Sequence, residues 1–124
     1  MATVNIYVSL DTSTSANPHV ILTTLGGGSA RSQKASSGAT IKWQKHDIND
    51  QFDITSLAPT GTGTAFATAT TGGGGQWLKS VYQPPSTNQD AQYPYTLTVT
   101  KDGIPYDTTK TTRDLVEDRP VIRN

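Results

Sequence analysis

The sequence contains no cysteine, which excludes disulfide bonds, thiolate metal sites and cysteine nucleophiles. It also lacks an excess of either charge, because ten lysines and arginines balance ten aspartates and glutamates. Nucleic-acid binding requires clustered basic side chains, so this balance argues against a nucleic-acid partner. A net charge near zero weakens the repulsion between copies of the chain and therefore favours self-association.

Long apolar runs are missing as well, and no stretch approaches the length that a membrane-spanning helix needs. The first residues show neither the basic nor the apolar region of a signal peptide, so we expect a cytoplasmic protein without a membrane partner. Hydrophobic residues make up only 33% of the 124 residues, which predicts a single domain over residues 1–124 with a small core and polar loops.

The clearest pattern lies in residues 93–100. Tyr93, Tyr95, Leu97 and Val99 fall on one side, and three threonines, at positions 96, 98 and 100, on the other, as expected of a strand with one face in a core and one in water. An Asp-Gly pair follows at residues 102–103 and predicts a hairpin turn. Pro105 in the returning segment favours an edge strand, because proline cannot donate to a ladder.

The rest of the chain repeats this pattern. Further strands are expected at residues 3–10, 19–25, 40–46, 52–57, 64–70, 76–82 and 104–112. Residues 31–38 are polar and without periodicity, and only residues 111–117 could form a helical turn. Short strands with frequent turn signals predict an all-β fold, a two-sheet antiparallel Greek-key sandwich of seven to eight strands, with a closed barrel as the alternative.

Three features of this pattern resemble the immunoglobulin-like group. Trp43 lies on the third predicted strand, where that group keeps a core tryptophan. Tyr93 and Tyr95 are similar to its corner tyrosine, and Leu97 stands where antibody domains place a cysteine. The resemblance implies an immunoglobulin-like sandwich without the disulfide bond.

The C-terminal quarter resembles small bacterial proteins of the AidA/PixA inclusion-body and DP-EP groups. These end in a tyrosine-rich strand, an Asp-Gly turn and an Asp-Pro-type segment that finishes in Ile-x-Asn. Here the last residues read Asp-Arg-Pro-Val-Ile-Arg-Asn, so Arg119 interrupts the Asp-Pro pair. The resemblance implies a bacterial source and a fold, but no specific function.

Metal binding has little support in the sequence. His19 and His46 are the only histidines, whereas zinc or copper needs three or four ligands. A calcium loop could be built from closely spaced oxygen ligands, namely Asp47, Asn49, Asp50 and Asp53. The loop lacks the glycine and distal glutamate of an EF-hand, so a polar turn is the competing interpretation. We therefore expect neither a metal nor another cofactor.

Catalytic machinery is not evident either. The glycine runs at residues 26–28 and 72–75 are not followed by a helical pattern, which a phosphate-binding loop requires. Hydroxyl groups are abundant, but two histidines give little basis for an activated nucleophile. We therefore expect the protein not to be an enzyme.

The segment at residues 76–82 suggests a binding surface. Trp77 and Leu78 are adjacent in a strand and must point to opposite faces, so one of them points away from the core. The candidate surface residues are Trp77, Leu78, Tyr82 and Tyr106. Self-association into a homo-oligomer, or binding of a protein partner, is the first hypothesis. A carbohydrate-binding module that uses surface aromatic residues is the alternative.

Overall fold

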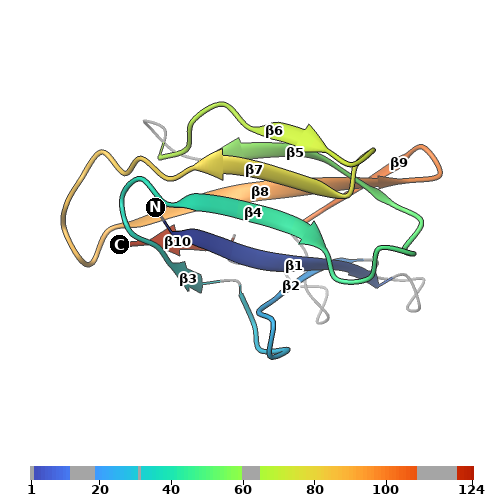
Figure 1. Ribbon diagram of the computed structural model, residues 1–124, viewed down its shortest axis with the longest axis horizontal. Coiled ribbons are helices and arrows are strands. Elements are labelled where there is room, and N and C mark those ends of the chain that lie inside the picture. The colour runs from blue at the N-terminus through green and yellow to red at the C-terminus, as the bar shows by residue number, and fades with distance from the viewer. Residues whose placement is uncertain (1, 12–18, 31, 60–64, 109–119) are drawn as a thin grey trace.

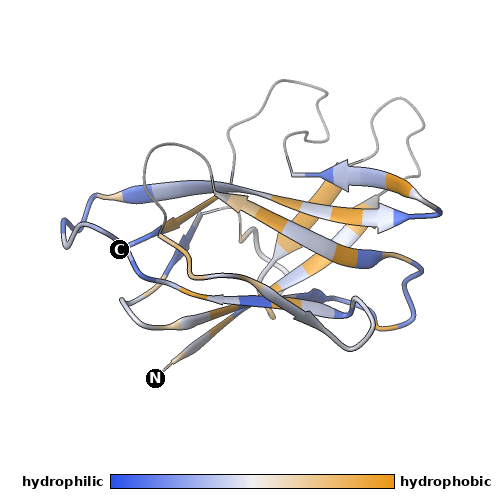
Figure 2. Cartoon of the chain, turned by 90° about the horizontal axis from the view of Figure 1, so that it is seen from above, coloured by the Kyte–Doolittle hydropathy of each residue, from blue (hydrophilic) through white to orange (hydrophobic). Residues whose placement is uncertain are grey.

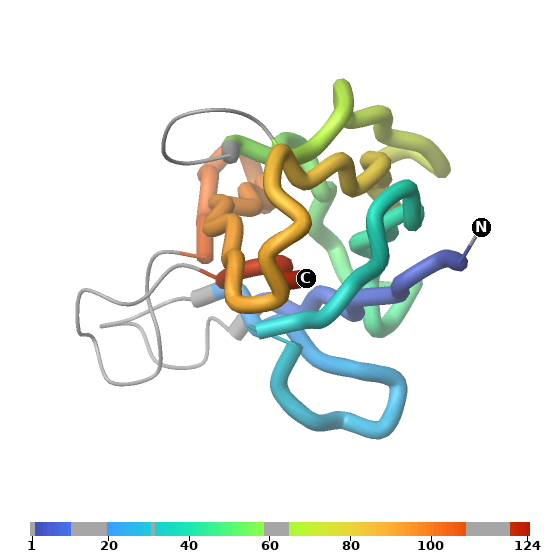
Figure 3. Tube along the Cα trace, turned by 90° about the vertical axis from the view of Figure 1, so that its left-hand side faces the viewer, coloured from blue at the N-terminus to red at the C-terminus, as the bar shows by residue number. Residues whose placement is uncertain are grey.

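The computed structural model describes residues 2–11, 19–30, 32–59, 65–108 and 120–124. Within these residues it contains ten β-strands and no helix. The strands form two sheets that pack face to face (Figures 1 and 3). The predicted all-β, two-sheet sandwich is therefore confirmed, whereas the predicted turn at residues 111–117 lies outside the described residues.

The first sheet has the strand order β2-β1-β4-β7-β6. Its strands are β1 (Thr3–Asp11), β2 (His19–Thr23), β4 (Thr40–Lys45), β6 (Thr70–Gly72) and β7 (Trp77–Val81). Neighbours run antiparallel, except that β1 and β4 run parallel.

The second sheet has the order β3-β10-β8-β5, and β9 also pairs with β8. Its strands are β3 (Ser32–Lys34), β5 (Asp53–Pro59), β8 (Gln92–Lys101), β9 (Ile104–Asp107) and β10 (Val121–Arg123). Only β10 and β3 run parallel in this sheet. In the described part of the chain β9 pairs with β8 alone, which confirms the edge position predicted from Pro105.

Two details of the predicted fold were wrong. The sheets are mixed rather than antiparallel, and the described residues contain ten strands rather than seven or eight. The polar strand β3 was missed because its pairing with β10, and not an apolar pattern, holds it in the sheet. The strand predicted at residues 64–70 is reduced to an isolated bridge between Phe66 and Tyr82, and the strand β6 starts only at Thr70.

The alternation read from the sequence is visible along the long strands in Figure 2, where apolar and polar positions follow one another. On β4, Ile41 and Trp43 are fully buried, and Thr40, Lys42 and Gln44, which alternate with them, are half-buried. On β8, Tyr95, Leu97 and Val99 are fully buried. Each of these two strands therefore gives one face to the core between the sheets.

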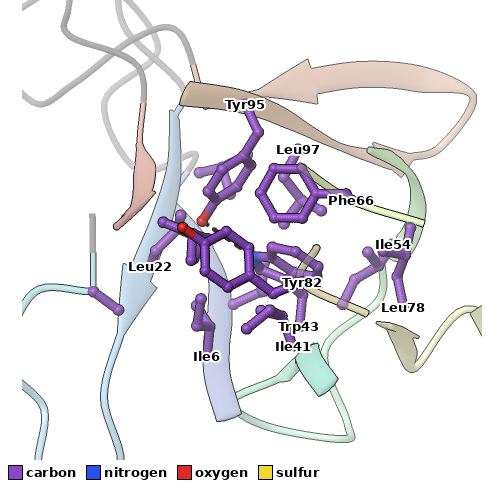
Figure 4. Close-up of a cluster of buried hydrophobic side chains, with 14 of the residues drawn as sticks. Ile6, Leu22, Ile41, Trp43, Ile54, Phe66, Leu78, Tyr82, Tyr95 and Leu97 are labelled. Atoms are coloured by element: carbon purple, nitrogen blue, oxygen red, sulfur yellow. Dashed lines mark hydrogen bonds between the residues drawn. The ribbon is translucent and has the colours of Figure 1, made fainter. Parts of the chain in front are cut away.

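Aromatic rings fill the centre of this core (Figure 4). The ring centroids of Trp43 and Tyr95 lie 5.2 Å apart, and Phe66 lies 6.2 Å from Trp43 and 5.8 Å from Tyr95, all edge to face. The indole Nε1–H of Trp43 donates to the Tyr95 hydroxyl at 3.1 Å. This bond joins the two sheets and gives the buried indole N–H a partner.

A second polar contact closes one end of the sandwich. The hydroxyl of Tyr82 donates to Oδ1 of Asn124 at 2.8 Å, while the Asn124 amide donates to the carbonyl oxygens of Ser86 and Asn88 at 2.8 and 2.7 Å. One asparagine side chain thus ties the loop between β7 and β8 to Tyr82, the residue that follows β7. Figure 3 shows this loop beside the C-terminus.

Tyr82 makes stability depend on pH at the alkaline end. Burial, and to a lesser degree the nearby Tyr93, raises the pKa of Tyr82 from 10.0 to about 12. Between these values the unfolded chain loses the phenol proton while the folded chain keeps it, so the free energy of unfolding falls by about 1.4 kcal/mol per pH unit from this group. Urea titrations between pH 9 and 12 should show this slope. In Tyr82→Phe the slope should be smaller by the contribution of about one proton. An unchanged slope in the variant would contradict the assignment.

Candidate functional site

Strand register decides which residues of β7 reach the surface. Leu78 lies opposite Trp43 across the β4–β7 ladder, and residues opposite each other share a face of the sheet. Leu78 therefore enters the core, where it is 1% exposed. Trp77 is paired with Gln44 and lies on the outer face of the first sheet, half-buried.

Outward side chains from three adjacent strands surround Trp77. We call this surface the Trp77 face and define it by Asn5, Tyr7, Lys42, Gln44, Trp77 and Lys79. Tyr7, Gln44 and Trp77 form one row across β1, β4 and β7. Asn5, Lys42 and Lys79 form the next row.

The indole of Trp77 packs over a glycine, Gly72, on the neighbouring strand β6. A β-carbon added at Gly72 would come within 2.0 Å of the six-membered ring of Trp77, so the ring occupies the space above that glycine. The ammonium groups of Lys79 and Lys42 lie 4.6 and 5.6 Å from the ring centroid. Both contacts are cation–π interactions on a partly solvated ring.

Polar groups line the rest of the face. The side-chain amide of Gln44, which lies between Tyr7 and Trp77 in its row, donates to Oδ1 of Asn5 at 3.0 Å, and this bond orients both amides. Tyr7 is half-buried, and its ring packs edge to face against the exposed His46 with centroids 6.2 Å apart. The face therefore combines two aromatic rings with amide and ammonium donors.

The four surface residues expected from the sequence do not come together. Leu78 and Tyr82 are core residues, with 1% and 0% of their surface exposed, and cannot contact a partner. Tyr106 is half-buried on β9 in the second sheet and packs against the core. Trp77 remains, and its neighbours Tyr7, Lys42 and Gln44 were not singled out.

The sequence does indicate that those neighbours point outward. Alternation places Asn5 and Tyr7 on the outer side of one strand and Lys42 and Gln44 on the outer side of another. Alternation does not predict the parallel pairing of β1 with β4, which brings these outward residues of the two strands side by side.

Local hydrogen bonds shape the segment that carries the candidate calcium ligands. The Asp47 carboxylate accepts the backbone N–H of Asn49 at 2.9 Å, and the Asp50 N–H donates to the Asp47 carbonyl at 3.0 Å. The carbonyl of Asp50 accepts the Lys45 ammonium at 2.9 Å. Asp53 belongs to β5 and packs against Gly75. This arrangement is a hydrogen-bonded turn, and among the described residues no three potential ligands cluster as a metal site.

Within the described residues, the two histidines and the two glycine runs do not form a site together. His46 lies at the end of β4, and the side chain of His19 is outside what the structure describes. The glycines at residues 26–28 form a turn after β2, and those at residues 72–75 end β6 and turn into β7. Both turns connect strand-paired segments, so neither has the following helix of a phosphate-binding loop.

A shallow depression of about 300 Å³ lies at the end of the sandwich near the C-terminus. It is lined by Lys34, Ala35, Ser36, Ser37, Pro84, Ser86, Thr87, Gln89 and Asn124. Both ends of the Asn124 amide already bond within the protein. The Asn124 amide therefore connects Tyr82 with the loop that borders the depression.

The comparisons with known proteins leave the function to be argued from these features. No protein-family model matches the chain, and no curated protein is significantly similar to it in sequence. Of the described residues, none form a helix with the length and apolar character needed to cross a membrane.

Proposed function

We propose that the protein is a non-enzymatic binding module that recognises carbohydrate through the Trp77 face. The observation that carries this proposal is the placement of Trp77, whose ring lies over Gly72 on the outer face of a five-stranded sheet. An aromatic ring held on a rigid sheet offers an apolar platform at little cost in conformational entropy.

The chemistry around the ring suits a sugar. A pyranose presents an apolar face of C–H groups and a rim of hydroxyl groups. The indole of Trp77 can stack on the first, while the amides of Asn5 and Gln44 and the ammonium of Lys79 can bond to the second. The two rows of outward side chains continue across three strands, which provides length for an extended chain of sugars.

Tryptophan fluorescence tests the proposal directly. Trp43 is fully buried, so a change in emission on adding oligosaccharides should come from Trp77. For a glycan identified on an array, Trp77→Ala should weaken binding at least about tenfold, or about 1.4 kcal/mol. Trp77→Phe keeps a ring and should retain part of the affinity.

Tyr106→Phe in the second sheet is the matched control and should bind like the unchanged protein. Circular dichroism of each variant verifies that the fold is kept. An array without any binder, or a Trp77→Ala protein with full affinity, would refute the proposal.

Self-association is the second candidate function. Its support is the set of large exposed apolar side chains, Leu25 and Ile48 in turns and Ile104 at the start of β9, which are 81%, 68% and 53% exposed, together with the zero net charge. Size-exclusion chromatography with light scattering should detect a dimer or larger species. A monomer at high concentration would exclude this function.

Relationship and location also stay predictions. We propose that the fold is related to the immunoglobulin-like group, based on the core residues Trp43 and Tyr95. We also propose that the protein is bacterial and related to the AidA/PixA and DP-EP groups, based on the C-terminal Ile-x-Asn. We also retain a cytoplasmic location. Cell fractionation with an antibody against the protein would test the location.

A further inference from the structure

The charges on the Trp77 face are arranged unfavourably for the protein on its own. Lys42 and Lys79 lie directly opposite each other on β4 and β7. Like charges at such a cross-strand pair destabilise a sheet. In the part of the chain that the structure describes, neither ammonium belongs to an ion pair, and both lie against the Trp77 ring, which they share.

From this pair we infer that the ligand of the Trp77 face is an acidic polysaccharide, such as a chain of uronic acids. This inference rests on the proposed carbohydrate function. A carboxylate placed between the two ammonium groups would relieve their repulsion and form two charge-assisted hydrogen bonds. The sugar ring that carries the carboxylate would then lie close to Trp77, since both ammonium groups are within 5.6 Å of its centroid.

Other anions fit this surface less well. A nucleic acid would present many phosphates, whereas the Trp77 face offers two lysines and the chain has no net positive charge. A neutral sugar would stack equally well but would leave the lysine pair uncompensated. A uronic acid polymer uses both features, because each unit has an apolar ring face and one carboxylate.

Titrations with four polymers test the inference. Polygalacturonate and alginate are compared with neutral dextran and with polyglutamate, which has carboxylates but no sugar rings. The acidic polysaccharides should bind at least tenfold more tightly than the other two at low salt. Raising the salt from 50 to 300 mM should weaken this binding several-fold, because the ion pairs are screened.

A double variant, Lys42→Gln with Lys79→Gln, should lose at least tenfold in affinity for polygalacturonate. The matched control removes the same charge from the second sheet, by Lys34→Gln with Lys101→Gln, and should change the affinity by less than twofold. All four substituted lysines lie in strands and none is fully buried. Circular dichroism verifies that each double variant is folded.

The outcomes separate the two proposals. Binding of dextran that equals or exceeds that of polygalacturonate overturns the acidic ligand and leaves the carbohydrate function standing. Equal binding of polyglutamate and polygalacturonate means that the face recognises charge alone, which overturns the inference. Failure of every glycan, here and on an array, removes both.

Discussion

Replacing Trp43 with alanine is expected to lower the free energy of unfolding by about 3–5 kcal/mol, the range for truncating a buried large aromatic residue. Trp43 is fully buried, packs edge to face against Phe66 and Tyr95, and bonds across the sandwich to the Tyr95 hydroxyl. Small domains have total stabilities of about 5–15 kcal/mol, so this loss is a large fraction of the free energy of unfolding. Urea denaturation followed by far-ultraviolet circular dichroism measures the loss.

Tyr95→Phe is the matched comparison for this prediction. It keeps the ring in the core but removes the acceptor of the indole N–H, so we expect a smaller loss of about 1–3 kcal/mol. A Trp43→Ala protein within 1 kcal/mol of the original stability would show that the centre of the core lies elsewhere.

The second large effect is expected at Gly75, in the turn between β6 and β7. Gly75→Ala should cost about 2–4 kcal/mol, because two penalties act together. Its φ of 92° is in a region that side chains disfavour, and an added β-carbon would lie 2.6 Å from Cβ of Asp53. The carbonyl of Gly75 also accepts the N–H of Ile54 at 2.8 Å, so any shift of the turn would disturb the start of β5.

Gly74 provides a control one residue earlier. Its φ is also positive, at 70°, but an added β-carbon there meets no atom within 4 Å. Gly74→Ala should therefore show the backbone penalty alone, roughly 1–2 kcal/mol. Equal losses for the two variants in thermal or urea unfolding would mean that the contact with Asp53 has no energetic weight.

The sequence was sufficient for the elements whose side chains alternate. β1, β4 and β8 were predicted nearly to the residue, because one face of each is apolar and the other polar. The strand β3, with the sequence Ser-Gln-Lys, has no such contrast. The parallel pairing of β1 with β4 was also out of reach, since alternation is the same for either direction.

The same limit applies to the candidate site. The sequence states that Trp77 and Leu78 point to opposite faces, but not which of them points outward. The answer depends on the register of β7 against β4, which places Leu78 opposite the buried Trp43. The pairing of Lys42 with Lys79 follows from the same register, so neither the Trp77 face nor the ligand chemistry proposed for it could be derived from the sequence without the ladder.

The position of β10 has a consequence for how the protein reaches its native state. Residues 121–123 lie between β3 and β8, with about ninety and thirty residues separating them from these partners along the chain (Figure 1). Until residues 121–123 pair with both partners, a gap remains in the middle of the second sheet. The sheet is thus completed only by contacts between segments far apart in the sequence, and such contacts favour slow folding, during which unpaired strand edges stay open to aggregation.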